Sequence, residues 1–597
     1  MNPPESAATT SPLRGVIVSI PVQVGDTVST ATGVAVVESM KMEHIVRAET
    51  AGHVTAIAVN VGDTVDVSQA LVYVDPRADT GAAAVADSGP DLDRIRPELA
   101  EALARVDGTL DAGRPEAVAK RHAQGRLTIR ESLARLLDDG SFVEYGGLTI
   151  AAQRLRRQVD DLIAKTPADG LLTGTGTVDG LPVAVLAYDY TVLAGTQGLH
   201  NHQKTDRLLE IAARQRLPLV LFAEGGGGRP GDTDTSAVAL LTVTSFRMMA
   251  KLTGTVPTVA IVSGYCFAGN AALAGSCDVI IGTEGSSLGM GGPAMIEGGG
   301  LGVVAPHDVG PMEVQWANGV LGRLVPDDPA AIDDARHYLS FFNPDVAAAE
   351  PADDQRLLRH LVPENRLRAY DVRPIIDTLA DPGSVLELRG GFGAGVVTAL
   401  ARIGGVPAGV LANNSRHLGG AIDGDAADKA ADFLTLCDAH RLPVVSLCDT
   451  PGFMVGPDAE KTATVRRFGA MFQAGAKLSV PMVLVVLRKA YGLGAMAMAG
   501  GDMHAPIATL SWPTGEFGGM GLEGAVRLGF RKELDAIADP AEREQAYQNL
   551  VAAAYEQGKA LNIASVFEID AVIDPADTRA EITKVLAHHR DATSAPR

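Results

Sequence analysis

The sequence has few aromatic residues and a large excess of acidic ones. Aromatic side chains make up 4% of the 597 residues, so few rings are available on which bases could stack. Acidic residues outnumber basic ones by 72 to 51, which gives a formal net charge of −21. A surface of that charge repels phosphate backbones and anionic membranes. We therefore expect no nucleic acid among the partners.

Cysteines and long apolar runs are also scarce. The four cysteines form no Cys-x-x-Cys pair, which argues against a disulfide framework or a zinc ribbon and favours buried thiols. No cluster of metal-ligating residues stands out, so no metal site is expected. No apolar run reaches about 18 residues without polar breaks, which argues against a membrane span. The N-terminus lacks the basic and apolar regions of a secretion signal, and we expect a cytoplasmic protein.

Residues 13–75 contain a small internal repeat. Residues 22–28 read Val-Gln-Val-Gly-Asp-Thr-Val, and residues 59–65 read Val-Asn-Val-Gly-Asp-Thr-Val, 37 positions later. Each copy has the pattern of a strand, a Gly-Asp turn and a second strand. Two such halves predict a small all-β barrel or sandwich. Lys41 lies near the middle of the duplication, where a hairpin must turn, so its amine is expected at an exposed tip.

Two methionines, Met40 and Met42, flank this lysine, although methionine at an exposed tip adds little to folding. The segment resembles the biotinyl domain of biotin-dependent carboxylases, whose motif is Ala-Met-Lys-Met, with Ser39 in place of the alanine. Lipoyl domains share the fold but usually lack the paired methionines. The resemblance implies that a biotin protein ligase attaches biotin covalently to Lys41, beside Met40 and Met42. Residues 76–94, rich in small residues at their start, are expected to form a flexible linker.

The rest of the chain is duplicated. Four pairs of matching positions share one offset of 225 residues: Gly180 and Gly405, Arg216 and Arg441, Gly269 and Gly494, and Lys204 and Lys429. A single shared offset predicts two homologous domains. We place them at 95–350, called the first copy below, and at 351–590, called the second copy.

Within each copy, short apolar runs alternate with helical segments. Residues 217–222, 256–262 and 480–487 predict buried strands, and residues 235–252 and 462–478 predict helices. Strands that are apolar throughout and alternate with helices indicate parallel sheets covered on both faces. The sequence therefore predicts an α/β fold for both copies.

Glycine-rich segments follow some of these strands, at 225–231 and at 492–494. Glycine lets a backbone approach a ligand closely, and a helix that begins there points unpaired N–H groups at an anion, as in an oxyanion hole. Residues 225–231 are not a phosphate-binding loop, because no Gly-Lys-Ser/Thr follows them. Residues 492–497 fit a relaxed G-x-G-x-x-A dinucleotide motif, a weak signal. Glycines that serve only helix–strand packing stay a further alternative.

Six short motifs are more specific: 122–128 (HAQGRLT), 139–144 (DGSFVE), 449–453 (DTPGF), 487–492 (LRKAYG), 511–514 (SWPT) and 520–526 (MGLEGAV). Together they resemble the carboxyltransferase β-subunit family of acyl-CoA carboxylases, which consists of two crotonase-like domains. The resemblance covers residues from about 115 to 590. It departs from the family at 226–231, where Gly-Gly-Ala-Arg-Ile-Gln is common, and at Leu493, which interrupts the usual Tyr-Gly-Gly-Ala.

The resemblance implies a reaction that uses main-chain N–H groups in two oxyanion holes and no side-chain base. Gly226 and Gly227 would hold the acyl-CoA carbonyl. The biotin carbonyl would lie at the second hole, beside Tyr491 and among the amides of Gly492, Leu493, Gly494 and Ala495. The pair within that stretch stays open between Leu493/Gly494 and Gly494/Ala495. The acyl pocket would include Gly291, Gly292 and Met496.

The implied function is the biotin carrier plus carboxyltransferase component of an acyl-CoA carboxylase. It would move CO2 from carboxybiotin to the α carbon of a short acyl-CoA, with acetyl-CoA or propionyl-CoA expected. A separate ATP-dependent biotin carboxylase subunit and a homo-oligomer, a dimer that can stack into a hexamer, are the implied partners. Two alternatives stay open: a decarboxylase or transcarboxylase component, and a biotin carrier scaffold without activity.

Overall fold

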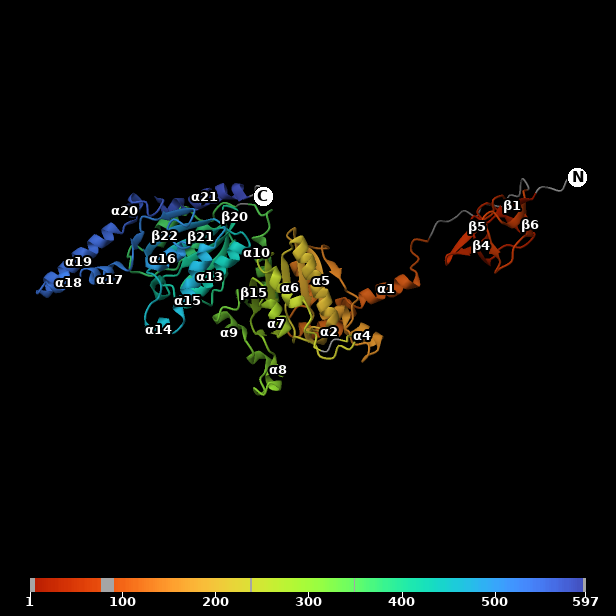
Figure 1. Cartoon of the computed structure of the whole chain (residues 1–597), viewed down its shortest axis with the longest axis horizontal. Helices are drawn as coiled ribbons and strands as arrows, with labels where there is room; N and C mark the ends of the chain where they lie inside the picture. The colour runs from red at the N-terminus through yellow and green to blue at the C-terminus, as the bar shows by residue number, and fades with distance from the viewer. Residues whose placement is uncertain (1–5, 77–90, 237–238, 348, 594–597) are drawn as a thin grey trace. The chain divides into compact units, whose positions relative to one another are not determined.

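The computed structural model describes residues 6–76, 91–236, 239–347 and 349–593, with side chains up to residue 587 (Figure 1). Contacts divide the chain into two compact units, Met1–Ile95 and Arg96–Arg597. We call them the small unit and the large unit and describe each by itself. Most of the expected linker at 76–94 lies outside the described residues.

The small unit consists of two four-stranded sheets, with strand orders β1-β8-β6-β3 and β5-β4-β2-β7. The strands are β1 (Ala7–Thr10), β2 (Gly15–Ser19), β3 (Thr27–Val28), β4 (Gly33–Ser39), β5 (Met42–Arg47), β6 (Gly52–Ile57), β7 (Thr64–Val65) and β8 (Ala70–Asp75). Valines such as Val37 and Val72 fill the space between the sheets. Gly25 and Gly62 take the same place in the two repeats, each with a positive φ that suits glycine. The predicted all-β sandwich is therefore present.

The first sheet of the large unit has the strand order β17-β15-β13-β12-β11-β10-β9. Its strands are β9 (Val143–Tyr145), β10 (Leu171–Val178), β11 (Leu181–Tyr188), β12 (Leu219–Phe222), β13 (Thr258–Val262), β15 (Val279–Thr283) and β17 (Arg323–Val325). Strands β11, β12, β13, β15 and β17 run parallel, as predicted. A separate parallel pair joins β14 (Tyr265–Phe267) to β16 (Ser287–Gly289).

The second sheet repeats this plan, with the order β18-β19-β20-β21-β22-β23-β25 and β24 paired to β22. Its strands are β18 (Leu386–Leu388), β19 (Val396–Ile403), β20 (Val406–Asn413), β21 (Val444–Thr450), β22 (Met482–Tyr491), β23 (Ala508–Ser511), β24 (Glu516–Gly518) and β25 (Ala571–Val572). The prediction of parallel sheets is wrong for two strand pairs in each copy: β9–β10 and β18–β19 are antiparallel, and so are the hairpins β10–β11 and β19–β20. Two-residue turns with positive φ, Asp179-Gly180 and Gly404-Gly405, connect these strands, and such turns join antiparallel neighbours.

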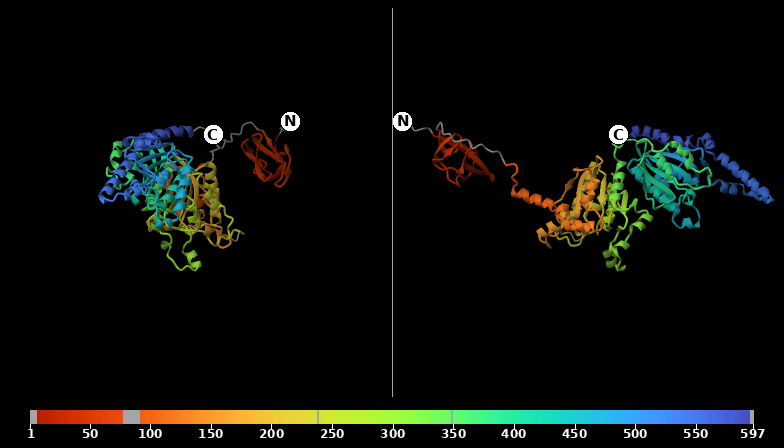
Figure 2. Two further views of the ribbon diagram at one scale, coloured as in Figure 1. Left: turned by 60° about the vertical axis from the view of Figure 1, so that its left-hand side comes forward. Right: turned by 180° about the vertical axis from the view of Figure 1, so that it is seen from behind.

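Helices cover the sheets and extend from them (Figures 1 and 2). In the first copy they are α1 (Pro97–Asp107), α2 (Pro115–His122), α3 (Ile129–Leu136), α4 (Val159–Lys165), α5 (Leu199–Gln215), α6 (Ser245–Leu252), α7 (Gly269–Ala274), α8 (Pro293–Gly298), α9 (Met312–Ala317) and α10 (Asp328–Ser340). In the second they are α11 (Leu358–Leu361), α12 (Arg373–Leu379), α13 (Gly424–Ala439), α14 (Pro457–Glu460), α15 (Thr464–Ala476), α16 (Gly492–Met498), α17 (Leu522–Gly529), α18 (Arg531–Asp535), α19 (Pro540–Gln557), α20 (Ala560–Ser565) and α21 (Thr578–Thr593).

One predicted helix is shorter than its pattern suggested. Residues 235–252 were expected to be helical, but α6 begins only at Ser245. The N–H groups of Thr233 and Asp234 donate to the carbonyl of Ala152, at 2.7 and 3.0 Å, which holds the preceding chain in a loop. Leu240 has a positive φ, which a helix does not accept. Local contacts of the loop therefore override the apolar periodicity.

Two buried lysines mark the duplication in three dimensions. The amine of Lys204 donates to the carbonyls of Ala168 and Leu171, and the amine of Lys429, 225 positions later, donates to those of Phe392 and Val396. Burial lowers the pKa of each lysine to about 8. Each amine therefore fastens a helix, α5 or α13, to the start of a hairpin in its own copy.

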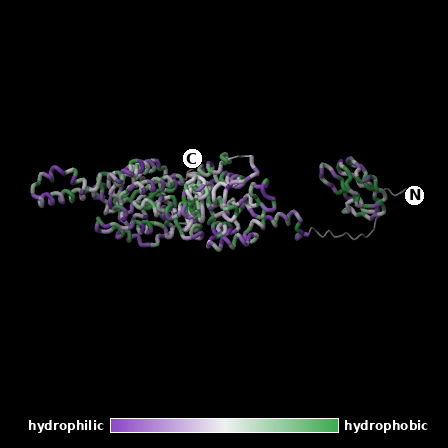
Figure 3. Tube along the Cα trace, turned by 90° about the horizontal axis from the view of Figure 1, so that it is seen from below, coloured by the Kyte–Doolittle hydropathy of each residue, from purple (hydrophilic) through white to green (hydrophobic). Residues whose placement is uncertain are grey.

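Hydrophobic stretches are short along the coloured parts of the trace and are interrupted by polar residues (Figure 3). Within the described parts of the chain, no helix is long and apolar enough to cross a membrane. The four cysteines, which are all described, are free, and three are buried, as the sequence predicted.

Candidate functional site

Lys41 lies at the tip of the hairpin between β4 and β5. Ser39 and Met42 are cross-strand partners, so Met40 and Lys41 alone form the turn. Both have positive φ values, 52° and 66°, which is the pattern of a type I′ turn. Such turns favour Asn-Gly, because side chains with a Cβ are strained in the left-handed region. A Met-Lys pair in this place is therefore a strained choice, of the kind found at functional sites.

The surroundings of this turn leave the amine accessible. Met40 is 95% exposed, Met42 is 65% exposed, and Lys41 itself is exposed. Among the described residues, no carboxylate lies within ion-pairing distance of the Lys41 amine. The neighbouring acids Glu38 and Glu43 face each other across the hairpin. The residues present thus fit a covalent attachment at this lysine.

In the first copy, the amides expected to form an oxyanion hole are already used. The N–H of Gly226 donates to the carbonyl of Ala194 at 3.2 Å, and the N–H of Gly227 donates to Asn270 Oδ1 at 3.0 Å. Neither group is free to bind a substrate oxygen in this conformation. The role expected for Gly226 and Gly227 stays a prediction.

The equivalent loop of the second copy gives the same result. Pro451 occupies the position of Gly226 and has no N–H, and the N–H of Gly452 donates to Thr450 Oγ1 at 3.1 Å. The carbonyl that Gly226 satisfies in the first copy corresponds to that of Gly419, which accepts from Lys489 Nζ at 2.7 Å. In both loops, therefore, the N–H groups of Gly226, Gly227 and Gly452 donate to acceptors within the chain and are not free to bind a ligand.

The helix that follows β22 offers free donors in the second copy. Helix α16 begins at Gly492, directly after Tyr491, and the first N–H groups of a helix have no acceptor inside it. Leu493 is 62% exposed, whereas Gly494 and Ala495 are buried. A Cβ on Gly494 would lie 2.6 Å from Gly452 Cα, so this position requires glycine. The two predicted pairs, Leu493/Gly494 and Gly494/Ala495, both lie in the first turn of this helix, and the choice between them stays open.

The corresponding helix start in the first copy is that of α7, which begins at Gly269. Gly269 is the partner of Gly494 at the offset of 225, and Ala268 is the partner of Leu493. The N–H of Ala268 donates to the carbonyl of Gly289, and the N–H groups of Gly269 and of the fully buried Asn270 have no acceptor inside the helix. The sequence analysis did not name these two residues as donors, although the offset that matched Gly269 to Gly494 points to this helix start.

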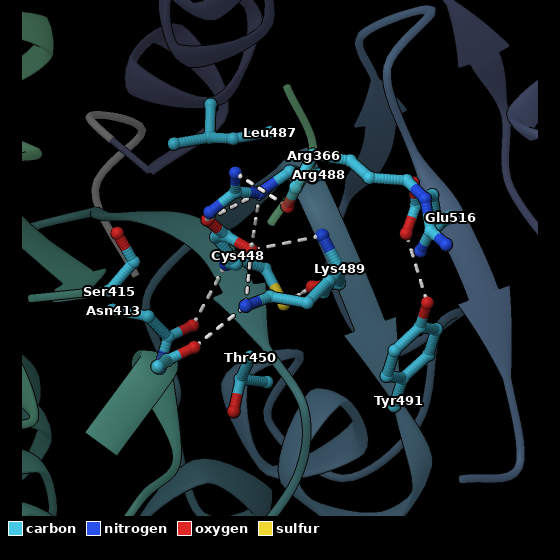
Figure 4. A network of polar contacts seen from close by, with 12 residues as sticks. Arg366, Asn413, Ser415, Cys448, Thr450, Leu487, Arg488, Lys489, Tyr491 and Glu516 are labelled. Atoms are coloured by element: carbon cyan, nitrogen blue, oxygen red, sulfur yellow. Dashed lines mark hydrogen bonds and ion pairs between the residues drawn. The ribbon is translucent and has the colours of Figure 1, made fainter. Parts of the chain in front are cut away.

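Polar side chains behind α16 fix its start (Figure 4). The hydroxyl of Tyr491 donates to Glu516 Oε2 at 3.0 Å, and Glu516 lies on β24, the strand paired with the end of β22. Burial raises the pKa of Glu516 and that of Tyr491. The side chain of Tyr491, the residue directly before α16, is therefore hydrogen-bonded to the neighbouring strand β24.

A buried ion pair lies on the same strand ends. Arg488 Nη2 is 2.9 Å from Asp449 Oδ2, and the side chains of both residues are almost fully buried. Lys489 follows, and burial lowers the pKa of its amine, an effect that the nearby Asp449 opposes. The positive charge of Lys489 lies beside the turn of Leu418–Gly420 (η6), to whose carbonyl at Gly419 it donates.

The residues expected in an acyl pocket lie on two elements. Gly292 precedes α8 and packs on Phe267, the last residue of β14, while Gly291 lies beside Met295. Met496 is half-buried on α16, in the second copy. The glycines and Met496 thus belong to different copies within one chain.

His202, Ser245 and Asp206 lie close together but do not form a catalytic triad. His202 Nδ1 is 2.9 Å from Ser245 Oγ, which donates to Asp206 Oδ1 at 2.5 Å. Here the serine lies between the histidine and the carboxylate, whereas a Ser-His-Asp triad needs the histidine in the middle. No group of three metal-ligating side chains occurs among the described residues either.

Comparison with known proteins identifies both units. A family model described as carboxyl transferase domain matches residues 120–595, and one described as biotin-requiring enzyme matches residues 6–74. The methylmalonyl-CoA carboxyltransferase 12S subunit of Propionibacterium freudenreichii subsp. shermanii is 35% identical over 81% of this chain and 93% of its own length. The propionyl-CoA carboxylase beta chain of Saccharopolyspora erythraea is 31% identical, over 85% and 96%.

Solved structures agree. A single-chain, multi-domain long-chain acyl-CoA carboxylase is 53% identical with a TM-score of 0.78; the match covers 98% of this chain and 56% of that one, so this chain spans little more than half of that protein's length. A transcarboxylase 12S structure, described as a hexamer with methylmalonyl-CoA bound, matches at 32% identity and a TM-score of 0.75, over 84% and 97%. The fold predicted from the sequence is thereby confirmed. The chain belongs to the carboxyl transferase family and has a domain of the biotin-requiring enzymes at its N-terminal side.

Proposed function

We propose that this chain carries a carboxyl group on biotin attached to Lys41 and transfers it to the α carbon of an acyl-CoA. The observation that carries the proposal is the joint presence of an exposed lysine in a strained two-residue turn and of open helix starts in both copies. When attached, biotin supplies an activated carboxyl group on its ureido ring. The rest of the chemistry falls to main-chain donors.

In the proposed reaction, the α C–H bond of the thioester would break and a C–C bond to the carboxyl carbon would form, while the N–C bond that joins this carboxyl group to biotin would break and the ureido nitrogen would take the α proton. The negative charge that develops on the thioester oxygen needs hydrogen-bond donors. We assign this role in the first copy to the N–H groups of Gly269 and Asn270, in place of Gly226 and Gly227. The start of α16, with Leu493 and Gly494, would serve the biotin carbonyl, and Gly492 and Ala495 flank that pair. Loss of one such donor typically costs about 2.7–4 kcal/mol of activation free energy.

The acyl chain is a separate question. Acetyl-CoA and propionyl-CoA were expected, but the relative with 53% identity is described as a long-chain acyl-CoA carboxylase. Gly291, Gly292 and the half-buried Met496 would allow a flexible apolar wall, which suits tails of several lengths. We propose that chains longer than propionyl are accepted, and a rate comparison across acyl-CoA lengths tests this.

The proposal requires two kinds of partner. Charging biotin needs an ATP-dependent biotin carboxylase, which we propose acts as a separate subunit, and biotin protein ligase must modify Lys41. We also propose a homo-oligomer in which Gly269 of one chain and Gly494 of another chain face the same acyl-CoA and biotin. The related 12S transcarboxylase structure, which is described as a hexamer, supports this proposal.

Transfer in the opposite direction is the second candidate. A methylmalonyl-CoA decarboxylase alpha subunit of Veillonella parvula is 30% identical over 82% of this chain, and the 12S subunit belongs to a transcarboxylase. Open N–H donors stabilise the same enolate in either direction.

The deciding experiment supplies the biotinylated chain with a biotin carboxylase, ATP, bicarbonate and a series of acyl-CoAs. Carboxylated acyl-CoA is the expected product, and the variant Lys41→Ala should form none and should no longer bind streptavidin. Loss of carboxyl groups from malonyl-CoA or methylmalonyl-CoA, without any carboxylation, would instead favour the decarboxylase. No reaction in either direction would favour a carrier scaffold.

A further inference from the structure

The end of β22 in the second copy has a positive charge that the first copy lacks (Figure 4). The charge belongs to Lys489, whose equivalent at the offset of 225 is Gly264. Gly264 has a positive φ, and a Cβ there would lie 2.0 Å from Glu224 Oε1, so a side chain would collide with this carboxylate. The two copies therefore differ at this place by one ammonium group.

The carboxylate nearest to this ammonium is already matched by another cation. Among the described residues, Asp449 is the one carboxylate within ion-pairing distance of the Lys489 amine, at 3.7 Å from Oδ1. Asp449 Oδ2 lies closer to Arg488, at 2.9 Å from Nη2. The acid on the neighbouring strand, Glu516, accepts the hydroxyl of Tyr491. Two cations thus share Asp449, which leaves the charge of Lys489 only partly compensated.

One carbonyl holds the amine in place and leaves it reachable. Lys489 Nζ donates to the carbonyl of Gly419 at 2.7 Å, and its side chain is 18% exposed. An ammonium has three N–H donors, so a further one is available to a ligand. Burial lowers the pKa of this amine, an effect that Asp449 opposes. A half-hidden cation with incomplete compensation is costly for the fold, which favours a function in binding an anion.

Contacts place this amine close to the open start of α16. Gly419 belongs to the turn η6, and two residues after this turn the N–H of Ile422 donates to the carbonyl of Gly452 at 3.1 Å. Gly452 lies against Gly494, in the first turn of α16. Through these contacts, the ammonium and the N–H groups of the helix start both adjoin the loop at 451–453.

The two kinds of donor match the two polar groups of carboxybiotin. Its ureido oxygen is neutral and suits the N–H groups of a helix start, whereas the carboxyl group on the adjacent nitrogen has a full negative charge and suits an ammonium. Biotin that has lost this carboxyl group presents only the ureido oxygen. The carboxylated acyl-CoA is the other carboxylate of the reaction, and its KM therefore serves as the comparison.

We infer that Lys489 binds the carboxylate of carboxybiotin and so lets the second copy distinguish the loaded cofactor from the discharged one. The ammonium and the helix start hold the loaded form together. Biotin without its carboxyl group keeps only the contacts with the helix start and leaves more easily. This inference rests on the proposed function and adds the recognition of the carboxyl group to it.

The test uses the full-length chain with Lys41→Ala, so that free biotin and free carboxybiotin are the only cofactors. Carboxybiotin is the donor to acetyl-CoA in one direction, and biotin is the acceptor from malonyl-CoA in the other. Lys489→Gln keeps an N–H donor but removes the charge, and it should raise the KM for carboxybiotin about tenfold. The KM values for biotin and for malonyl-CoA should change less than twofold. Lys489→Arg, which keeps the charge, should stay closer to the unchanged chain than Lys489→Gln. Lys477→Gln, at the exposed end of α15, is the matched control and should have no effect.

A double variant separates the charge from the hydrogen bond. In the first copy, the carbonyl of Ala194, the equivalent of Gly419, accepts from the N–H of Gly226. The second copy has Pro451 in place of Gly226 and therefore lacks this N–H. Pro451→Gly returns an N–H to this place, so the carbonyl of Gly419 can be satisfied in Lys489→Met without any charge. The KM for carboxybiotin should stay as high in the double variant as in Lys489→Met. Recovery of the original KM would mean that the lysine only holds the turn, and would overturn the inference.

Three other results would also overturn it. Equal changes of the KM for carboxybiotin and for biotin would mean that Lys489 supports the whole site. A change confined to malonyl-CoA would assign the lysine to the carboxylate of the acyl-CoA, and no change at all would leave the charge without a ligand.

Failure of the proposed function is distinguishable, because an inactive chain can still be tested for binding of radiolabelled biotin and carboxybiotin by ultrafiltration. The Lys41→Ala chain should bind carboxybiotin about tenfold more tightly than biotin. Addition of Lys489→Gln should make the two affinities equal. Equal binding of both ligands to the Lys41→Ala chain would refute the inference independently of turnover.

Discussion

Glu224 and Asp449 occupy equivalent positions in the two copies, 225 residues apart, yet their arginine partners come from unrelated places. Arg121 precedes the first sheet and pairs with Glu224, at 2.6 Å between Nη2 and Oε2. Arg488 is on β22 and pairs with Asp449. The position of Arg488 in the first copy is Ser263. Both copies therefore have a buried acid at this position, but the arginine that pairs with it comes from a different part of the fold in each copy.

We expect Arg488→Met to unfold the second copy at much lower denaturant. Removing one partner of a buried pair leaves the other charge unpaired and costs about 3–5 kcal/mol. Here the substitution also removes donors to the carbonyls of Arg366 and Arg368. Urea unfolding followed by fluorescence measures the loss. Arg356→Met, which breaks an exposed pair with Asp354, is the control and should leave the midpoint unchanged. Equal stability of both variants would contradict the expected role of burial.

The strained turn at Lys41 leads to a prediction of opposite sign. The double variant Met40→Asn, Lys41→Gly installs the pair that type I′ turns favour. Relief of left-handed strain should stabilise the hairpin by roughly 1–2 kcal/mol. Slower hydrogen exchange of β4 and β5 in the full chain would report the gain, while streptavidin binding should be lost. Lys41→Arg is the control, since it removes the attachment site and keeps the strain. Faster exchange in the double variant would show that the turn is not strained.

Local patterns predicted much of this architecture, and long-range contacts account for what they missed. The repeat at 22–28 and 59–65 and the offset of 225 revealed the β sandwich and the duplicated α/β units, because duplication leaves its trace in the sequence itself. Which N–H groups are already bonded within the fold was not predictable in this way. Gly226 looks available in the sequence, and only the fold brings the carbonyl of Ala194 to its N–H.

The buried lysines predict an unusual dependence on pH. Burial lowers the pKa of Lys429 to about 8 in the folded chain, whereas an exposed lysine has a pKa of 10.5. Between these values the unfolded chain binds more protons, so the stability contribution of this group rises with pH and its cost is fully present below about pH 8. A tenfold difference in proton affinity between the folded and unfolded chains corresponds to about 1.4 kcal/mol. Urea unfolding at several pH values from 7.5 to 9.5 should show a steeper rise for the wild type than for Lys429→Met. Parallel profiles would mean that the amine keeps an ordinary pKa.

The assignment of the first oxyanion hole can be tested by removing one N–H group. Gly226→Pro eliminates the amide, and the second copy already has proline at the equivalent position, Pro451, so the backbone of this loop is expected to accept it. If Gly226 does not bind the thioester oxygen, kcat should fall less than threefold. If it does, loss of the donor should lower kcat by about 10²–10³. Gly269→Ala is the contrasting variant, because a Cβ there would lie 2.0 Å from Gln197 Oε1, so that either the side chain of Gln197 or the helix start must shift. We expect that variant to lose most of its transfer rate, measured with malonyl-CoA as carboxyl donor, while its unfolding midpoint stays close to that of Gly226→Pro. A large loss of kcat in Gly226→Pro, together with an active Gly269→Ala, would mean that the loop after β12 forms the oxyanion hole.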